Sequence, residues 1–543
     1  MKLRSVMQHQ FSQVPRAEIQ RSTFDRSHGY KTSFDAGYLI PIYRDEALPG
    51  DTFSLNLTAI ARLTTPLRPV MDNMVMDFHF FAVPIRLIWD NWQHFNGEQV
   101  AGSLDPVGST DFICPVMNSG AAASYATGSL HDYLGLPTLV NNVEHVSFWH
   151  RAYNLIFREW YRDQNLQLPP VVDVDDGPDD PADYVLLRRG KRHDYFTSCL
   201  PWPQKGDSVS IPLGTEAPVL GIGKENDNWA AGPINVYESG STGVQSFANY
   251  QMINPAGADT QFYVERDLSA GGNTVGSPYI RADLTNATAA TINQLRQSFQ
   301  IQKLYERDAR GGTRYTEILK SHFGVTSPDQ RLQRPEYLGG GSVPVVFNSV
   351  VQTNAQASSL GFVNTVAGAW PAQAGAIAKG VGFTKSFTEH CVLLGLVSVR
   401  ADLTYQQGLP REYSRSTRWD FYWPALAHIG EQAVLNKEIY FQNTAADDEV
   451  FGYQERYAEY RYKPSQITGS FRSNVVASLD IWHLSQEFGA LPVLNSSFIQ
   501  ETPPVDRVVA VTTEPEFIYD SFIQLKCARP MPVYGVPGMI DHF

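Results

Sequence analysis

A short basic segment carries the densest set of chemically versatile side chains in the sequence. It reads "LLRRGKRHDYFTSCLPWPQKG", residues 186–206, and contains Arg188, Arg189, Lys191, Arg192, His193, Tyr195, Phe196 and Cys199. Guanidinium and ammonium groups neutralise phosphate, and neighbouring aromatic rings stack on unpaired bases. The same groups also pair with acidic surfaces of another subunit. The residues alone therefore leave DNA binding and an intersubunit contact open for Arg188, Arg189, Lys191 and Arg192.

Catalysis is the weaker interpretation of this segment. Cys199 and His193 have the types of a nucleophile and a base, but six residues of separation do not indicate that they meet. The sequence contains no HExxH, GxSxG or GxxxxGK[ST] motif, and Gly311–Gly312 in "RDARGGTRY" is better interpreted as a helix break. Cysteines 114, 199, 391 and 527 lack CxxC spacing, which disfavours structural zinc and favours reduced thiols. We expect no enzyme and no cofactor, and a metal remains an open question.

The acidic run "DVDDGPDDPAD", residues 173–183, superficially resembles a calcium loop. An EF-hand needs oxygen donors at alternate positions and a final Glu, whereas Gly177 occupies a donor position and Tyr184 replaces the Glu. Like charges in a row repel one another. We therefore expect a solvated, extended loop, with calcium in an irregular loop as the alternative.

A second mixed stretch, "FGYQERYAEYRYKPSQITGSFR", spans residues 451–472. On a strand, Arg456 and Tyr460 would share one face, and Glu459 and Arg461 the other. A Tyr and Arg ladder is suited to stacking, but its glutamates would repel phosphate. The pattern favours an intersubunit contact through Arg456 and Arg461.

Charge is low and uneven along the 543 residues. Charged residues make up 18% of the chain and aromatic residues 12%, a composition typical of surfaces covered by other subunits. The net charge is −13, yet residues 1–34 contain six basic and two acidic groups, so the remainder carries −17. This distribution disfavours a generic DNA-binding protein. It favours a basic arm, 1–34, whose Lys2, Arg4, Arg16 and Arg21 contact DNA or a neighbouring subunit, with a disordered terminus of chance charge as the alternative.

Strand patterns dominate the rest of the chain. Apolar residues alternate in 51–63, 75–84 and 516–530, and the run 390–403 predicts a strand buried on both faces at its start. Helical periodicity occurs in 144–163, 290–310 and 313–324, the last with Gly324 as a C-terminal stop. Strands this far apart favour a sandwich with elaborate loops. We predict a mainly β fold.

Residues 214–290 have a different composition, with ten glycines and eight acidic against three basic groups. Such a segment forms little core, so we expect a surface insertion between two strands of the body. The implied division is the arm 1–34, a first part of the body at 35–213 with a helical insertion near 145–164, the insertion 214–290, and a second part at 291–543. No apolar run is long enough for a signal peptide or a membrane span, so we expect a soluble chain made in the cytoplasm.

Long blocks of the sequence resemble the major capsid protein of the gokushoviruses, small single-stranded DNA phages of the Microviridae. The blocks run in order along nearly the whole chain and include 34–53 ("FDAGYLIPIYRDEALPGDTF"), 69–92, 189–206 ("RGKRHDYFTSCLPWPQKG"), 302–340, 452–469 and 528–543 ("ARPMPVYGVPGMIDHF"). The resemblance implies an eight-stranded antiparallel viral jelly roll with long inserted loops and a few helices. It also implies self-assembly into a T=1 icosahedral shell around a circular single-stranded DNA genome.

The resemblance further implies partners and a location. The 214–290 insertion would form a protrusion at the threefold axes and contact a host surface receptor, and the arm would face inward. A small basic DNA-binding protein and a DNA pilot protein would accompany the genome, without membrane insertion. The chain would be made and assembled in the host bacterial cytoplasm and reside in the virion. A single-stranded DNA-binding protein of replication and an all-β carbohydrate-binding protein are the alternatives.

Overall fold

The computed structural model describes residues 20–64, 66–68, 70–98, 112–209, 292–345 and 381–534, and the backbone of four two-residue strands between 219 and 282. The chain divides into two compact units, Met1–Lys205 with Glu306–Phe543, and Gly206–Tyr305. Lys2, Arg4 and Arg16 lie outside the described residues, as does most of 214–290.

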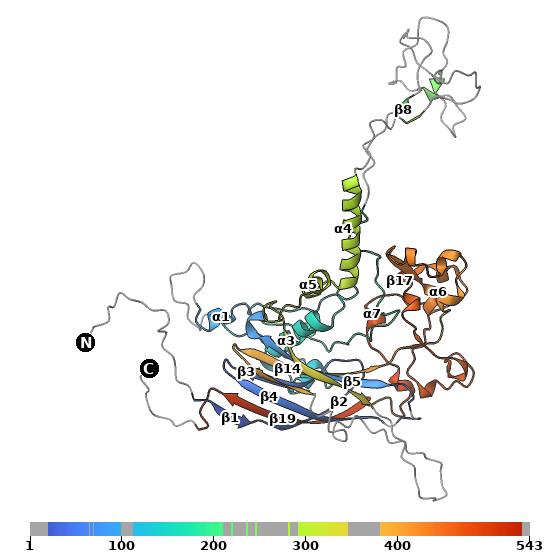
Figure 1. The fold of residues 1–543 in the computed structure, drawn as a ribbon. Coiled ribbons are helices and arrows are strands. Elements are labelled where there is room, and N and C mark those ends of the chain that lie inside the picture. The colour runs from blue at the N-terminus through green and yellow to red at the C-terminus, as the bar shows by residue number, and fades with distance from the viewer. Residues whose placement is uncertain are drawn as a thin grey trace, which may run out of the picture. The chain divides into compact units, whose positions relative to one another are not determined.

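Two stacked antiparallel sheets form the body of the larger unit (Figure 1). One has the order β1–β19–β4–β13, with β2 also paired to β19, and the other has the order β12–β5–β14–β3. The bounds are β1 (Ser22–Asp25), β2 (His28–Phe34), β3 (Ile40–Ala47), β4 (Thr52–Leu63), β5 (Met74–Pro84), β12 (Glu336–Val345), β13 (Gly382–Ser386), β14 (Cys391–Ala401) and β19 (Phe517–Arg529). Because β1 and β2 pair with successive parts of β19, they form one bent edge strand. The first sheet has five described strands and the second has four, an arrangement consistent with a jelly roll.

The predicted alternation places the core between these sheets. In β4, Phe53, Leu55 and Leu57 are buried while Ser54 and Asn56 are exposed. In β19, every second residue from Phe517 to Cys527 is buried. β14 is buried along both faces up to Val399, as its continuous apolar run predicts. The mainly β prediction is confirmed.

A second core covers the outer face of the β12–β5–β14–β3 sheet. There α3 (Phe148–Ile156), continued by a π-helical turn η3 (Phe157–Tyr161), packs against Phe81, Val392 and Leu394 (Figure 1). The helix arises where the sequence predicts it, because one stripe of 144–163 is apolar. The predicted helical insertion therefore closes one face of the sandwich.

Two further helices follow the predicted periodicity, α4 (Ile292–Gly311) and α5 (Tyr315–Phe323). α5 ends at Gly324, which has a left-handed φ of 70° and donates its N–H to the carbonyl of Lys320 at 3.0 Å. In the described part of the chain, no helix is long and apolar enough to cross a membrane.

The remaining elements are short. They are α1 (Trp92–Phe95), β6 (Val116–Asn118), α2 (Leu130–Tyr133), β7 (Glu144–Val146), β8 (Val219–Leu220), β9 (Asn235–Val236), β10 (Gln245–Ser246), β11 (Arg281–Ala282), β15 (Thr404–Tyr405), β16 (Glu431–Leu435), α6 (Asn436–Ile439), β17 (Val450–Glu455), β18 (Ser465–Gln466) and α7 (Ser496–Ile499). A third core lies beside the basic segment in the larger unit, while β8 to β11 belong to the smaller unit.

The N-terminal residues 22–34 are strands of the sandwich, although the sequence places them in the basic arm. Tyr30, Thr32 and Phe34 face inward from β2, while Lys31 and Ser33 alternate with them on the exposed side. Burial of the apolar residues in this alternation favours the strand more than the scattered positive charges oppose it. Any arm therefore ends before Ser22.

The predicted strand across 451–462 is wrong beyond Glu455, where β17 ends. Tyr457 has a left-handed φ of 62°, and a short 3-10 helix follows at Ala458–Tyr460. The side chain of Gln432 accepts the N–H of Tyr457 at 3.0 Å and donates to Glu459 at 2.6 Å, which replaces the strand pairing. Arg456 and Arg461 therefore do not lie on one ladder.

Candidate assembly and nucleic-acid surfaces

Main-chain hydrogen bonds connect the basic segment, residues 186–206, to the body of the larger unit. The N–H of Arg189 donates to the carbonyl of Gly37 at 2.7 Å, and the N–H of Lys191 donates to the carbonyl of Ile499 at 2.7 Å. The carbonyl of Arg189 accepts from the N–H of Glu501 at 2.8 Å. The segment thus joins the turn between β2 and β3 to the residues that follow α7.

Arg189 forms a buried ion-pair cluster with Asp77 of β5. Its Nη1 lies 2.7 Å from Asp77 Oδ2 and 2.7 Å from Ser398 Oγ, while Arg400 Nη2 lies 2.8 Å from the same carboxylate oxygen. Burial raises the pKa of the Asp77 carboxyl, but the charge of Arg189 and hydrogen bonds from Ser342 and Arg400 lower it more, so it lies below its usual value. The Arg189 charge is taken up inside the chain.

Arg188 is half-buried and also engaged within the chain. Its guanidinium carbon lies 3.9 Å from the ring centroid of Tyr38, and its Nη1 donates to the carbonyl of Glu501 at 3.0 Å. Stacking on an aromatic face and bonding to a carbonyl hold its planar group in one orientation.

Lys191 and Glu501 are two buried ionisable groups near each other. Lys191 Nζ donates to Gln486 Oε1 at 2.7 Å and lies 4.6 Å from the Phe498 ring centroid. Burial lowers the pKa of Lys191 to about 8 and raises the pKa of Glu501 to about 7. Glu501 Oε1 accepts from the N–H of Ala401 at 3.3 Å, but its buried Oε2 has no partner in the described structure. These groups hold the β14 end against the basic segment.

Arg192 and Arg21 present their charge to solvent. Arg192 is 3.6 Å from Asp402, and both side chains are about two-fifths exposed, at 38% and 42%. The exposed Arg21 donates to the carbonyl of Gly50 at 2.7 Å and to Thr52 Oγ1 at 3.0 Å. Four of the described cations that the sequence analysis named as candidate contacts remain accessible to an external anion. They are Arg21, Arg192, Arg456 and Arg461.

Cys199 is buried beside a cleft of about 850 Å³ whose lining also includes His193. Its Sγ donates to the carbonyl of Tyr195 at 3.3 Å, and burial raises the pKa of the thiol well above its usual value. A protonated, buried thiol is a poor nucleophile. All four cysteines are free.

The acidic run is only in part the solvated loop that we expect, because Asp179 is packed against α3 while Asp175, Asp176, Asp180 and Asp183 are exposed. Asp179 is buried, and its carboxylate oxygens lie 2.5 and 2.7 Å from the guanidinium of Arg151, which is itself fully buried. Asp176 accepts from Trp89 Nε1 at 2.7 Å. One buried cation and an indole N–H overcome the repulsion among the aspartates.

An exposed surface rich in arginine and aromatic residues lies beside β16 and β17. We call it the aromatic–arginine surface and define it as Arg415, Arg418, Trp419, Phe421, Tyr422, Trp423 and Tyr460. Arg415 lies 4.4 Å from the ring centroid of Tyr460, and Arg418 lies 4.5 Å from that of Trp423. Trp419 is 56% exposed and Tyr422 51%. Arg456 extends this surface, because its Nη2 donates to the carbonyl of Trp419 at 3.2 Å.

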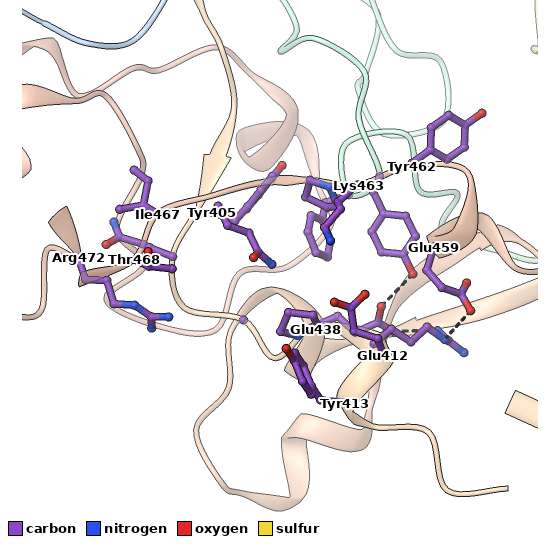
Figure 2. Close-up of a pocket in the computed structure, with 18 residues that line it drawn as sticks. Tyr405, Glu412, Tyr413, Glu438, Glu459, Tyr462, Lys463, Ile467, Thr468 and Arg472 are labelled. Carbon is purple, nitrogen blue, oxygen red and sulfur yellow. Dashed lines mark hydrogen bonds and ion pairs between the residues drawn. The ribbon is translucent and has the colours of Figure 1, made fainter. Parts of the chain in front are cut away.

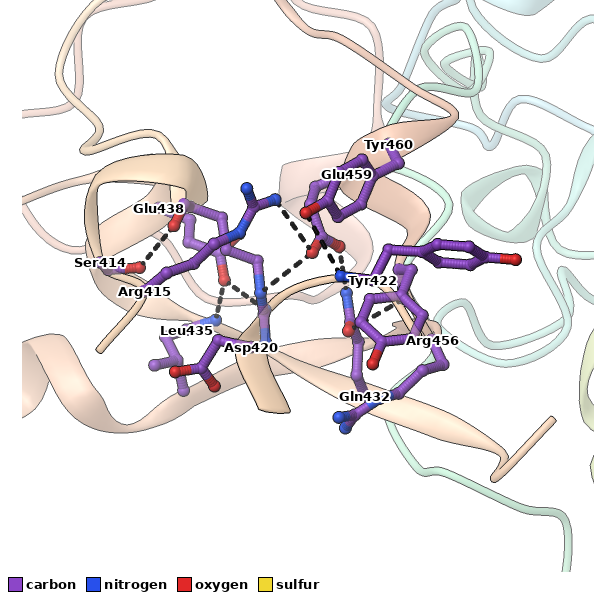
Figure 3. Close-up of polar contacts among 12 residues, drawn as sticks. Ser414, Arg415, Asp420, Tyr422, Gln432, Leu435, Glu438, Arg456, Glu459 and Tyr460 are labelled. Carbon is purple, nitrogen blue, oxygen red and sulfur yellow. Dashed lines mark hydrogen bonds and ion pairs between the residues drawn. The ribbon is translucent and has the colours of Figure 1, made fainter. Parts of the chain in front are cut away.

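A polar network beneath this surface holds it in place (Figure 3). Arg415 lies 3.5 Å from Glu459, and Glu459 accepts from Gln432 at 2.6 Å. Arg411 pairs with the buried Glu438 at 2.8 Å. Charge-assisted bonds of this kind restrict side-chain freedom. The exposed rings are therefore presented on a preorganised base.

A pocket of about 280 Å³ shares Arg411, Glu438 and Glu459 of the same network in its lining (Figure 2). Its lining combines the rings of Tyr405, Tyr413 and Tyr462 with the carboxylates of Glu412 and Glu438. Aromatic walls with a few polar groups are typical of binding pockets.

Sequence reasoning did not single out the aromatic–arginine surface. The signal was present as "REYSRSTRWDFYW", residues 411–423, which contains three arginines and five aromatic residues within thirteen positions. No alternation or helical stripe organises them, because much of the segment consists of short 3-10 turns, η5 (Arg411–Tyr413) and η6 (Arg418–Asp420).

Comparison with known proteins finds capsid proteins that match nearly the whole chain. The capsid protein (F protein) family model matches residues 12–539. Capsid protein VP1 of Bdellovibrio phage phiMH2K is 46% identical over 99% of this chain and 98% of its own length. VP1 of Chlamydia phage 1 is 44% identical over 99% of each chain, and VP1 of Spiroplasma virus 4 is 34% identical over 98% of this chain and 97% of its own.

These matches confirm the resemblance to gokushovirus capsid proteins and a structural, non-enzymatic role. They also place the chain in a multimeric shell within the virion, in agreement with the sandwich and its exposed aromatic–arginine surface. The chain belongs to the capsid protein (F protein) family of phages.

Proposed function

We propose that the chain builds a T=1 icosahedral capsid around a circular single-stranded DNA genome, and that the aromatic–arginine surface is one of its subunit contacts. The observation that supports this contact is the exposure of Trp419 and Tyr422 beside a network of charge-assisted bonds from Arg415 to Glu459 and from Arg411 to Glu438. Trp, Tyr and Arg dominate the binding energy of protein interfaces. An uncovered cluster of these residues is costly on a monomer but useful in a closed assembly.

DNA contact is proposed for the cations that the fold leaves accessible. Arg21 and Arg192 are accessible in the described structure, and Lys2, Arg4 and Arg16 belong to an N-terminal arm that would face inward. Arg188, Arg189 and Lys191 would support such a contact indirectly, because their charges are engaged within the chain. Arg456 and Arg461 are proposed as intersubunit contacts.

The net charge supports further partners. Residues 35–543 carry −17, so the shell alone does not neutralise packaged phosphate. A small basic DNA-binding protein would supply the missing cations, and a DNA pilot protein would accompany the genome. We propose that residues 214–290 form a protrusion at the threefold axes that contacts a host surface receptor, and that assembly takes place in the host bacterial cytoplasm.

Expression of the full chain with these small partners tests assembly. We expect uniform isometric particles of T=1 size by electron microscopy and a single fast peak in sedimentation. Trp419→Ala should lower particle yield at least tenfold while the unassembled chain unfolds at the wild-type denaturant concentration. Leu168→Ala, at an exposed apolar position outside the aromatic–arginine surface, is the matched control and should assemble normally. Normal particle yield from Trp419→Ala would reject this contact.

A further inference from the structure

Three histidines from separate elements lie close together in the region that covers the outer face of the β12–β5–β14–β3 sheet. They are His131 of α2, His145 of β7 and His150 of α3. One ring nitrogen of each lies within 4.8 Å of those of the other two. His131 Nδ1 and His150 Nε2 are 2.9 Å apart, and these two side chains are 6% and 2% exposed.

The hydrogen bonds of this cluster leave ring nitrogens available to a ligand. His145 Nδ1 is 3.0 Å from the carbonyl of Val146, which can only accept, so the proton of the neutral ring sits on Nδ1. His145 Nε2 then carries a lone pair, and it lies 2.9 Å from the hydroxyl of Tyr125. A carbonyl that fixes the tautomer of a histidine is the usual support for a metal ligand.

His150 is the member whose polar atoms are least satisfied. Its Nε2 shares one proton with His131 Nδ1, and its buried Nδ1 has no hydrogen-bond partner in the described structure. Buried polar atoms are normally paired, and an exception calls for a role or an unobserved ligand. The ring also packs edge-on against Tyr184 at 5.9 Å, which holds it in place.

We propose that His131, His145 and His150 bind one divalent transition-metal ion of the Zn²⁺ class, with the Tyr125 hydroxyl or a water in the fourth position. Tetrahedral zinc with bonds of about 2.0–2.1 Å to histidine requires nitrogen atoms about 3.3 Å apart. The 2.9 Å pair needs a small opening, and the third ring nitrogen, which lies within 4.8 Å of the other two, must move closer. Neutral imidazoles suit zinc and its neighbours rather than calcium or magnesium.

Such an ion would join α2 and β7 to the first turns of α3. β7 is separated from α3 by Ser147 alone, whereas α2 lies farther back along the chain, and α3 closes the second core. A shared ion would therefore fasten the whole 125–150 region to the sandwich, independently of any subunit contact.

The test uses the full-length chain without a histidine tag and Zn²⁺ as the probe. After chelation and dialysis, the chain is titrated with Zn²⁺, bound zinc is counted by elemental analysis, and X-ray absorption at the zinc edge identifies the ligands. We expect one zinc per chain, with imidazole nitrogen at about 2.0–2.1 Å and no sulfur shell at about 2.3 Å. A chain that binds no stoichiometric zinc, or whose zinc has sulfur ligands, overturns the proposal.

Substitution then assigns the ligands. His145→Gln, at the only partly exposed member of the cluster, should weaken zinc binding at least a hundredfold and remove the thermal stabilisation by Zn²⁺. His428→Gln, at an exposed histidine outside the cluster, is the control and should bind like wild type. Wild-type affinity in His145→Gln would contradict the proposal. If that variant does not fold, the absorption spectrum of the wild-type chain still decides.

Discussion

Replacing Arg189 and Arg192 separately by Ser should separate a fold-stabilising cation from a surface cation. Arg189→Ser leaves Asp77, which is 4% exposed, without one of its two cationic partners. Loss of one member of a buried ion pair costs about 3–5 kcal/mol. Because Arg400 stays 2.8 Å from the same oxygen, we expect the lower end, about 3 kcal/mol.

Arg192→Ser should behave differently. Its pair with Asp402 is 3.6 Å long and about two-fifths exposed, and such pairs contribute no more than about 1 kcal/mol. We therefore expect an almost unchanged free energy of unfolding, together with less DNA per particle or fewer particles if Arg192 contacts DNA or a neighbour. Arg192→Lys retains the charge and serves as the matched control.

The assay is denaturant unfolding of the unassembled chain, combined with particle yield and DNA content after assembly. Arg189→Ser should shift the unfolding midpoint strongly, and any loss of particles should follow from that shift. An Arg189→Ser variant within 1 kcal/mol of wild type would refute the buried-pair reasoning. Equal loss of unfolding free energy in both variants would refute the distinction between the two cations.

Three further predictions concern buried groups. Burial raises the pKa of Glu501 from 4.5 to about 7, so the contribution of its protonated form to stability is full below pH 4.5 and is lost as pH rises to 7. The free energy of unfolding of Glu501→Gln should therefore exceed that of wild type by about 3 kcal/mol at pH 8, and the two should be equal at pH 4.5. Asp179→Ala leaves the fully buried Arg151 without its closest carboxylate and should lower the unfolding free energy by about 3–5 kcal/mol in denaturant titrations. Gly395→Ala would place a methyl 2.7 Å from the ring of Phe80, so calorimetry should show a loss of about 1–3 kcal/mol, and an unchanged melting temperature would contradict that close approach.

Strands with a clear apolar pattern were predictable, by alternation in β4 and by a continuous apolar run in β14, and β12 was not. In β19, only Ser521 interrupts the apolar residues at every second position, so period alone also identifies this strand. β12 contains three consecutive glycines, Gly339–Gly341, which supply no side-chain pattern. Gly340 is required there because an added Cβ would collide with the carbonyl of Phe78 on β5. The strand exists because a neighbour pairs with it, and that neighbour is more than 250 residues away.

The basic segment shows a similar limit to what the sequence alone predicts about functional sites. Its composition correctly marked it as a place where charge matters, but the partners of Arg189 and Lys191 are Asp77 and Gln486, which lie 112 and 295 residues away. The histidine cluster was equally hidden, because its members are separated by irregular intervals and meet only through α2, β7 and α3. Local pattern reports residue types, whereas long-range pairing decides which groups stay accessible.

The separation of buried, paired cations from exposed cations has a physical reason in a chain that folds before it assembles. A cation already paired with a buried carboxylate loses more by leaving that partner than it gains from solvated phosphate, so Arg189 is unsuited to reversible contact with DNA. Arg192 and Arg418 keep solvent-facing charge and exchange partners cheaply. We therefore expect that different substitutions within a few residues of one another, such as those at Arg189 and Arg192, alter subunit stability and shell assembly separately.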